Sequence, residues 1–274
     1  MAFSSDVLTL ETTDHVATLW LDRPDQLNAF GPAFWSDVPE AMREVSTDAA
    51  TRAVIIAARG RAFTSGLDLR AMADLLLGTD DERAGVEQQQ KIYAEIKRMQ
   101  AAISAVAQCP KPVIAAVHGY CLGAGLDLIT ACDVRLAASD VVFSVRETRM
   151  AIVADLGTLQ RLTPIVGPGH AAELIYTGSD IDAERAWRIG LVNDVHASTE
   201  ALHEAALAMA RRIAANSPLA VQGAKAVVQA GAGRSVDEAL DYVALWNTAF
   251  LRSDDLAEAL AAFKEQRPPH FQGR

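Results

Sequence analysis

Three acidic residues, Asp127, Glu147 and Asp155, have the side-chain type and the setting for proton transfer. Glu147 and Asp155 flank a mostly apolar stretch, and burial in such surroundings pushes the pKa values of two carboxylates apart. One group then acts as an acid and the other as a base at a single pH. This chemistry requires the side chains to lie close together, which their spacing along the chain does not prove.

Each carboxylate also has a structural interpretation that the residues leave open. Asp127 would lie in the first turn of a predicted helix, where its negative charge interacts favourably with the helix dipole. Glu147 is placed to pair with Arg146 or Arg149. Asp155 comes directly before a predicted helix and is placed to cap it.

Two loops that follow predicted strands contain glycine, which lets a backbone approach a ligand closely. The first, residues 61–69, contains Gly66 and is also compatible with a plain turn in which Asp68 caps a helix. The second, residues 118–127, contains Gly123 and leads into a predicted helix. A strand, a glycine-rich turn and a helix start together leave free N–H groups that favour an anion.

Neighbouring residues argue against other chemistry for these loops. A dinucleotide fingerprint requires a further glycine where Leu128 stands, and no Gly-Lys-Ser/Thr follows as in a P-loop. Ser65 lacks the first glycine of a hydrolase nucleophile elbow. His118 is interpreted as a structural residue that is hydrogen-bonded near the turn.

Composition limits the partners of the chain. It has 274 residues and a net charge of −10, which argues against nucleic acid or an anionic membrane as a partner. Three cysteines at no metal-like spacing argue against a disulfide scaffold and a metal site. The N-terminus has no apolar signal segment and the last residues are not a peroxisomal tripeptide, so we expect a cytoplasmic location.

The apolar pattern predicts a mixed α/β core followed by helices. Short apolar runs predict strands over residues 7–10, 16–21, 54–57, 113–117, 134–136 and 141–144. Helical spacing predicts helices over residues 33–45 and 87–107. From residue 198 the sequence is rich in Ala and Leu at helical spacing, without a strand pattern. We therefore divide the chain into a core, residues 1–197, and a helical region, residues 198–274.

Several motifs in combination resemble the crotonase (enoyl-CoA hydratase/isomerase) superfamily over almost the whole chain. They are Asp22-Arg23-Pro24 with Leu27-Asn28-Ala29, residues 62–69, residues 109–119, Leu122-Gly123-Ala124-Gly125, and Ala262-Phe263 with Arg267. The resemblance implies an α/β crotonase fold, which is a spiral of repeated ββα units with a C-terminal helical region for oligomerisation.

Within this superfamily the chain is most similar to the Δ3,5-Δ2,4-dienoyl-CoA isomerases. These carry Asp, Glu and Asp at the positions of Asp127, Glu147 and Asp155, whereas the hydratases usually have Glu, Glu and a glycine-rich segment. The chain departs from many relatives at Ala124, where they have Gly, but the amide N–H is kept. The implied activity shifts a 3,5-dienoyl-CoA to a 2,4-dienoyl-CoA. The alternatives are an enoyl-CoA hydratase and a non-catalytic acyl-CoA-binding protein.

The resemblance also implies roles for individual residues. The thioester oxygen would lie in an oxyanion hole formed by the N–H groups of Leu67 and Ala124. Asp155 would be the base at C2 and Glu147 the acid at C6, with Asp127 supporting the pair. The residues implied to contact the acyl-CoA are Arg23, Ala62, Gly66, Leu67, Asp68, Leu69, Arg70, Gly125 and, from a neighbouring subunit, Lys264. Coenzyme A enters as part of the substrate, so no separate cofactor is expected, and the family implies a homotrimer or a dimer of trimers.

Overall fold

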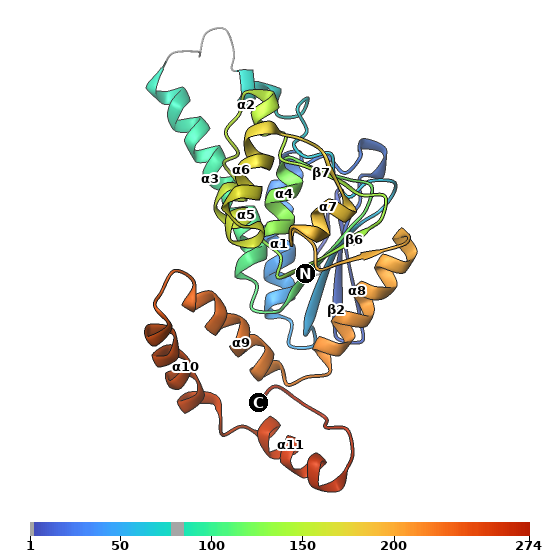
Figure 1. Ribbon diagram of the computed structural model, residues 1–274, viewed down its shortest axis with the longest axis vertical. Coiled ribbons are helices and arrows are strands. Elements are labelled where there is room, and N and C mark those ends of the chain that lie inside the picture. The colour runs from blue at the N-terminus through green and yellow to red at the C-terminus, as the bar shows by residue number, and fades with distance from the viewer. Residues whose placement is uncertain (1–2, 78–84) are drawn as a thin grey trace.

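A six-stranded sheet lies at the centre of the computed structural model, which describes residues 3–77 and 85–274 (Figure 1). Its strand order is β1-β2-β3-β4-β6-β9; β1 pairs antiparallel with β2, and all the other pairings are parallel. The strands are β1 (Leu8–Thr13), β2 (Val16–Leu21), β3 (Ala53–Ala58), β4 (Val113–Val117), β6 (Val134–Ala138) and β9 (Asp194–His196). β3 and β4 are buried at every residue, which explains why they are continuous apolar runs.

The chain also forms a second, three-stranded sheet, and two of its strands follow parallel strands of the first sheet along the chain. Its order is β5-β7-β8, formed by β5 (Tyr120–Leu122), β7 (Val142–Ser144) and β8 (Ile181–Asp182). β5 follows β4, β7 follows β6, and α4 (Ala124–Thr130) follows β5 directly. The segment after β3 joins this sheet through a bridge between Thr64 and Cys121. The predicted α/β class with ββα units is therefore confirmed.

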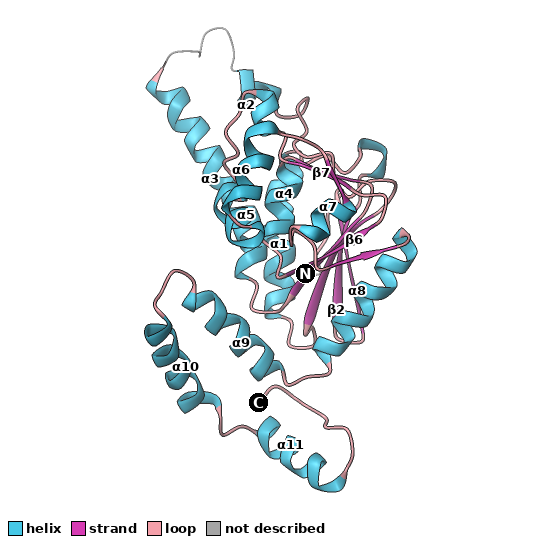
Figure 2. Ribbon diagram, viewed as in Figure 1, coloured by secondary structure: helices cyan, strands magenta, loops and turns pink. Residues whose placement is uncertain are grey.

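Helices cover both faces of the large sheet, as the cyan ribbons of Figure 2 show. One face shares a buried cluster with α1 (Pro32–Thr47), α3 (Val86–Gln108) and α4. The other face packs against a stripe of small and apolar residues on α8 (Thr199–Ala214) that recur at helical spacing. The shorter helices are α2 (Ala73–Leu77), α5 (Thr158–Val166), α6 (Pro168–Thr177) and α7 (Ala183–Arg188), with the 3-10 turns η1 (Pro24–Gln26) and η2 (Glu147–Met150).

Three C-terminal helices lie apart from the sheet, in the lower part of Figure 1. They are α9 (Pro218–Gly231), α10 (Val236–Phe250) and α11 (Asp254–Glu265). They expose large apolar side chains, including Leu245 at 70% and Phe263 at 84%. The predicted domain boundary at residue 197 stays a prediction; the structure places α8 on the sheet and α9–α11 away from it.

The six predicted strands and two predicted helices are present with ends shifted by a few residues. The apolar pattern does not predict β5, β8 or β9, because strands of two or three residues are too short to show alternation. The described part of the chain has no strand after residue 198, as predicted. The three cysteines are buried free thiols. In the described ranges no helix combines the length and apolar character needed to cross a membrane.

Candidate active site

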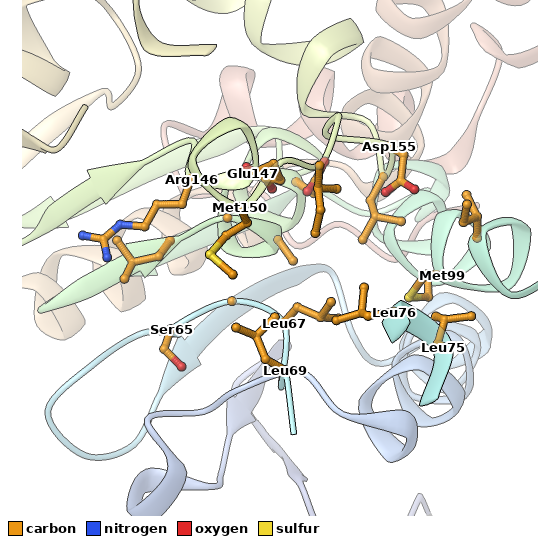
Figure 3. A pocket seen from close by; sticks show the side chains of 18 of the residues that line it. Ser65, Leu67, Leu69, Leu75, Leu76, Met99, Arg146, Glu147, Met150 and Asp155 are labelled. Carbon is orange, nitrogen blue, oxygen red and sulfur yellow. The ribbon is translucent and has the colours of Figure 1, made fainter. Parts of the chain in front are cut away.

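A pocket of roughly 320 Å³ lies between α2, α3 and the loops that follow β3, β5 and β7 (Figure 3). Its lining brings together the two glycine loops and the three carboxylates that the sequence analysis singles out. These lining residues are Gly66, Leu67, Gly123, Ala124, Asp127, Glu147 and Asp155. The three carboxylates therefore lie at one pocket, which their spacing along the chain alone does not prove.

The two glycine loops meet through their backbones at Gly66. This residue has φ +90°, and a Cβ on it would lie 2.6 Å from the Leu122 carbonyl oxygen and 3.6 Å from the Ala124 amide nitrogen. Thr64 holds the loops together, since its N–H donates to Tyr120 O at 2.8 Å and its carbonyl accepts from Leu122 N–H at 3.2 Å. Glycine is required here because it tolerates both the positive φ and the contact.

The amides of Leu67 and Ala124 lie at this junction. Within the described ranges neither amide donates a hydrogen bond to another protein group. Leu67 forms a β-bridge with Phe30, but the hydrogen bonds of this bridge are donated by the amides of Phe30 and Asp68. Ala124 is the first residue of α4, where helical N–H groups have no acceptor in their own helix. The pocket is therefore lined by two peptide groups whose N–H donors have no acceptor among the described residues.

Asp127 is almost fully buried beneath the pocket, with 1% of its surface exposed. Its Oδ1 accepts a hydrogen bond of 2.6 Å from the N–H of Thr158, the first residue of α5. Asp127 belongs to α4, but its carboxylate therefore caps α5. Burial raises the pKa of Asp127 to about 7; the hydrogen bond from Thr158 opposes this rise, and the charges of Glu147 and Asp155 add to it.

Glu147 begins η2 and makes no ion pair within the described ranges, because Arg146 and Arg149 both pair with Asp180. Its Oε2 is buried and has no hydrogen-bond partner in the described part of the chain. Its Oε1 lies 3.5 Å from the place that a Cβ on Gly123 would take, so the carboxylate is next to the peptide that precedes Ala124. Burial raises the pKa of Glu147, and the charge of Asp155 raises it further.

Asp155 lies in the irregular segment between η2 and α5 and does not cap α5. The N-cap position belongs to Gly157, and the first amide of the helix is bound by Asp127. Burial raises the pKa of Asp155. In Figure 3 its side chain lies toward the end of the pocket where Met99 is found, whereas Glu147 lies nearer the middle.

Apolar side chains surround the end of the pocket where Asp155 lies. Leu75 of α2 and Met99 of α3 are found there in Figure 3, and Ile92 and Ile96 of α3 also line the pocket. The three α3 residues belong to the helix predicted over residues 87–107, but their sequence pattern does not assign them to a site. The same spacing serves a core face and a pocket wall, so the pattern contains no signal that separates the two.

The residues predicted to contact the acyl-CoA fall into two groups. Gly66, Leu67 and Leu69 line the pocket. The others lie outside its lining: Arg23, Ala62, Asp68, Arg70, Gly125 and Lys264. Arg23 pairs with Asp68 at 3.5 Å, and Lys264 is in the last turn of α11. The contacts of these residues with a ligand stay predictions.

The pocket does not have the composition of a serine hydrolase site. Ser65 lines it, but none of the described residues that line it is a histidine, so no imidazole base stands beside this hydroxyl. His118 is buried, and its Nε2 is bonded to Gly60 O at 2.9 Å, which agrees with a structural role. In residues 3–77 and 85–274 no cluster of His, Cys, Asp or Glu is arranged to hold a metal ion.

Comparison with known proteins gives one family and a consistent group of relatives. Residues 11–274 match the model of the enoyl-CoA hydratase/isomerase family. The chain is 44% identical to the mitochondrial Δ(3,5)-Δ(2,4)-dienoyl-CoA isomerase of Dictyostelium discoideum, covering 96% of this chain and 90% of that protein. It is 41% identical to the peroxisomal enzyme of the same name from Arabidopsis thaliana, covering 97% and 96%. The solved structure of an enoyl-CoA hydratase from Bacillus anthracis superposes with a TM-score of 0.89 at 32% identity, covering 98% and 100%.

The expected cytoplasmic location is wrong by this comparison, because the relatives are named as mitochondrial or peroxisomal proteins. The expectation used only short segments at the two ends of the chain. Cellular receptors recognise such targeting segments, and the folded enzyme does not need them for its structure. Fold and chemistry therefore carry no information about the compartment.

Proposed function

The chain belongs to the enoyl-CoA hydratase/isomerase family, and on this premise we propose that it isomerises a 3,5-dienoyl-CoA to a 2,4-dienoyl-CoA. The observation that carries the proposal is the position of Asp155. Its carboxylate faces the same pocket as Glu147 and the two unused amides, but lies farther toward the aliphatic end. A reaction that removes a proton from one carbon of an acyl chain and adds a proton at a distant carbon requires two such groups.

The amides of Leu67 and Ala124 would form the oxyanion hole. When a proton leaves C2, negative charge develops on the thioester oxygen, and fixed N–H donors stabilise it without reorganisation. Both donors are backbone groups, so Ala124 supplies its N–H as well as a glycine would. The buried surroundings strengthen the interaction because water does not compete for the oxygen.

The arrangement favours Glu147 as the base at C2 and Asp155 as the acid at C6. This reverses the roles that the resemblance implies. C2 is bonded to the thioester carbon, so its base must stand next to the oxyanion donors, and Glu147 is the carboxylate beside the Gly123–Ala124 peptide. Asp155 lies toward Met99, where the more distant carbons of the acyl chain would run.

The proton balance follows from these positions. The Glu147 carboxylate takes a proton from C2, the electron pair moves through the C3–C4 and C5–C6 double bonds, and protonated Asp155 gives its proton to C6. The double bonds then stand at C2–C3 and C4–C5, and no water is added. One carboxylate must begin ionised and the other protonated. Burial raises the pKa of both groups, and the charge of Asp155 raises the pKa of Glu147 further, which favours such a singly ionised pair.

Hydration of a 2-enoyl-CoA is the second candidate, because the superposed B. anthracis protein is a hydratase. A hydratase needs a water held between two carboxylates. Asp127 is one of the residues that such a reaction would use, but its Oδ1 is occupied by Thr158 N–H. The third carboxylate and the aliphatic wall favour isomerisation.

The association of subunits belongs to the same proposal. The exposed apolar side chains of α10 and α11 would be covered in a trimer or a dimer of trimers, and Lys264 of α11 would then be available to the coenzyme A of a neighbouring subunit. Light scattering should give the mass of a trimer or of twice a trimer. A monomeric mass at working concentration would contradict this part.

The activity is tested by offering the purified protein a 3,5-dienoyl-CoA and a 2-enoyl-CoA in separate assays. We expect the absorbance of the conjugated 2,4-dienoyl thioester to grow in the first assay. The absorbance of the enoyl thioester should persist in the second. Loss of the enoyl absorbance, together with no reaction of the dienoyl substrate, would instead identify a hydratase.

A further inference from the structure

Asp155 lies on a stretch of backbone that regular structure does not support. Residues 153–156 belong to no helix or strand, and within the described ranges their backbone groups make no hydrogen bond to another backbone group. Among the described residues, two hydrogen bonds from other residues reach this stretch, and both come from side chains. Gln100 donates to the Asp155 carbonyl at 2.6 Å, and Arg161 donates to the Leu156 carbonyl at 3.2 Å.

The amide of Gln100 is held in one orientation by its two partners. Its Oε1 accepts from Lys97 Nζ at 2.8 Å, while its Nε2 donates to Asp155 O. An ammonium group can only donate and a carbonyl oxygen can only accept, so these partners fix which end of the amide faces each. The donor is thus pre-oriented toward the Asp155 carbonyl.

Gln100 projects from a helix that is anchored in the core. Its neighbours on α3 include the buried residues Met99, Ala102 and Ile103. Met99 also lines the pocket, so the same helical turn forms part of the wall and holds the loop. A side chain on a packed helix gives the irregular stretch a fixed point that its own backbone does not supply.

We infer that Gln100 is a positioning residue that fixes the backbone at Asp155 and thereby sets where its carboxylate stands in the pocket. The inference rests on the proposed isomerase function. Proton delivery depends on exact placement, and a shift of about 1 Å reduces a rate by roughly 10²-fold. Arg161 supports the adjacent carbonyl through a longer bond, and it is itself bonded to Ser104 at 3.3 Å.

The first test replaces Gln100 with leucine, which is of similar size but has no donor. The kcat of Gln100→Leu for isomerisation should fall by roughly 10- to 100-fold, with a much smaller change in KM. In an Asp155→Asn background the same replacement should lower kcat little further, because the carboxylate that Gln100 positions is already absent. The matched control is Gln90→Leu, which makes the same change at an exposed glutamine of α3 and should behave as wild type.

The second test uses Gln100→Glu. The ordinary pKa of glutamate is about 4.3, and the ammonium of Lys97 beside it favours the ionised form, so this variant is ionised over the range in which the enzyme is assayed. The ionised carboxylate can only accept and repels the Asp155 carbonyl, although it has the size of the glutamine side chain. The kcat of Gln100→Glu should therefore fall by roughly 10-fold or more, with a much smaller change in KM. A side chain that only fills space would leave kcat unchanged.

Three results would overturn the inference. The first is a kcat of Gln100→Leu within about twofold of wild type, and the second is an equal loss with and without Asp155. If the leucine variant does not fold, a kcat of Gln100→Glu within about twofold of wild type is the third. If the wild-type protein does not isomerise dienoyl-CoA, the proposed function fails and this inference fails with it. If the wild-type protein is active but Gln100→Leu keeps its kcat, only this inference fails.

Discussion

The two amide donors and the two carboxylates proposed to transfer protons share one pocket but are held in different ways. Leu67 and Ala124 present backbone groups whose place is set by Gly66 and by the pairing of Thr64 with the second sheet. Asp155 is a side chain on a stretch held by side chains from α3 and α5. The donors therefore depend on backbone contacts between two loops, and the Asp155 carboxylate depends on side chains that reach its backbone.

The largest effect is expected from removing the carboxylates. Glu147→Gln and Asp155→Asn should each lower kcat for isomerisation by roughly 10²- to 10⁴-fold, because each removes one proton-transfer partner. Binding of the acyl-CoA, measured by calorimetry with an unreactive thioester, should change little. Glu204→Gln, at an exposed glutamate of α8, is the control and should keep full activity.

These two variants also separate the carboxylates from each other. With Glu147 as the base at C2, Asp155→Asn should still exchange the C2 proton with solvent deuterium, and Glu147→Gln should not. The opposite pattern would restore the roles that the sequence resemblance implies. Near wild-type turnover of both variants would contradict the two-carboxylate mechanism altogether.

A smaller effect is expected at the donors. Gly66→Ala would place a Cβ 2.6 Å from Leu122 O, so the two loops must separate and the Leu67 amide must move. Losing one donor in such a site lowers kcat by roughly 10²- to 10³-fold. The control is Gly233→Ala, where φ is also positive (+75°) but no atom lies within 4 Å of the new Cβ. Equal kinetics for the two variants would show that strain at glycine, and not the contact between loops, is responsible.

This difference explains how much of the site can be predicted from the sequence. The glycine loops are visible because a conformational requirement restricts the residue type at Gly66 and Gly123. The three carboxylates are visible as residue types, but Asp127, Glu147 and Asp155 each also fit a local structural role. Asp127 does lie in the first turn of its helix, as that role requires. The other two roles fail, because Asp127 binds the first amide of α5 in place of Asp155, and Asp180 pairs with both arginines in place of Glu147.

The aliphatic wall and the support of Asp155 are beyond the reach of the sequence pattern. Ile92, Ile96 and Met99 have the spacing of an ordinary core helix, so the pattern alone does not show that they face a pocket. Gln100 is separated from Asp155 by 55 residues and reaches a carbonyl, which every residue has. The large sheet is predictable because β3 and β4 are continuous apolar runs, whereas β5, β8 and β9 are too short.

The smallest expected effect concerns stability at Asp127, the carboxylate that supports the others. Its pKa is about 7 in the fold and its ordinary value is 3.8, so the native state holds the proton more tightly than the unfolded chain. Its contribution to stability is complete below its ordinary pKa and is lost as the pH rises through about 7. Asp127→Asn should therefore raise Tm relative to wild type at pH about 8 by more than at pH about 5. A larger stabilisation at the lower pH would contradict the burial effect.

The most direct test of the proposed mechanism follows the protons themselves. A 3,5-dienoyl-CoA labelled with deuterium at C2 is converted by the wild-type protein, and the product is analysed by mass spectrometry and NMR. We expect a 2,4-dienoyl-CoA that keeps one deuterium at C2 and carries a hydrogen from solvent at C6, without added water, because Glu147 takes the deuteron and Asp155 gives its own proton. A product in which the deuterium from C2 has been transferred to C6, or one heavier by a water molecule, would contradict the mechanism.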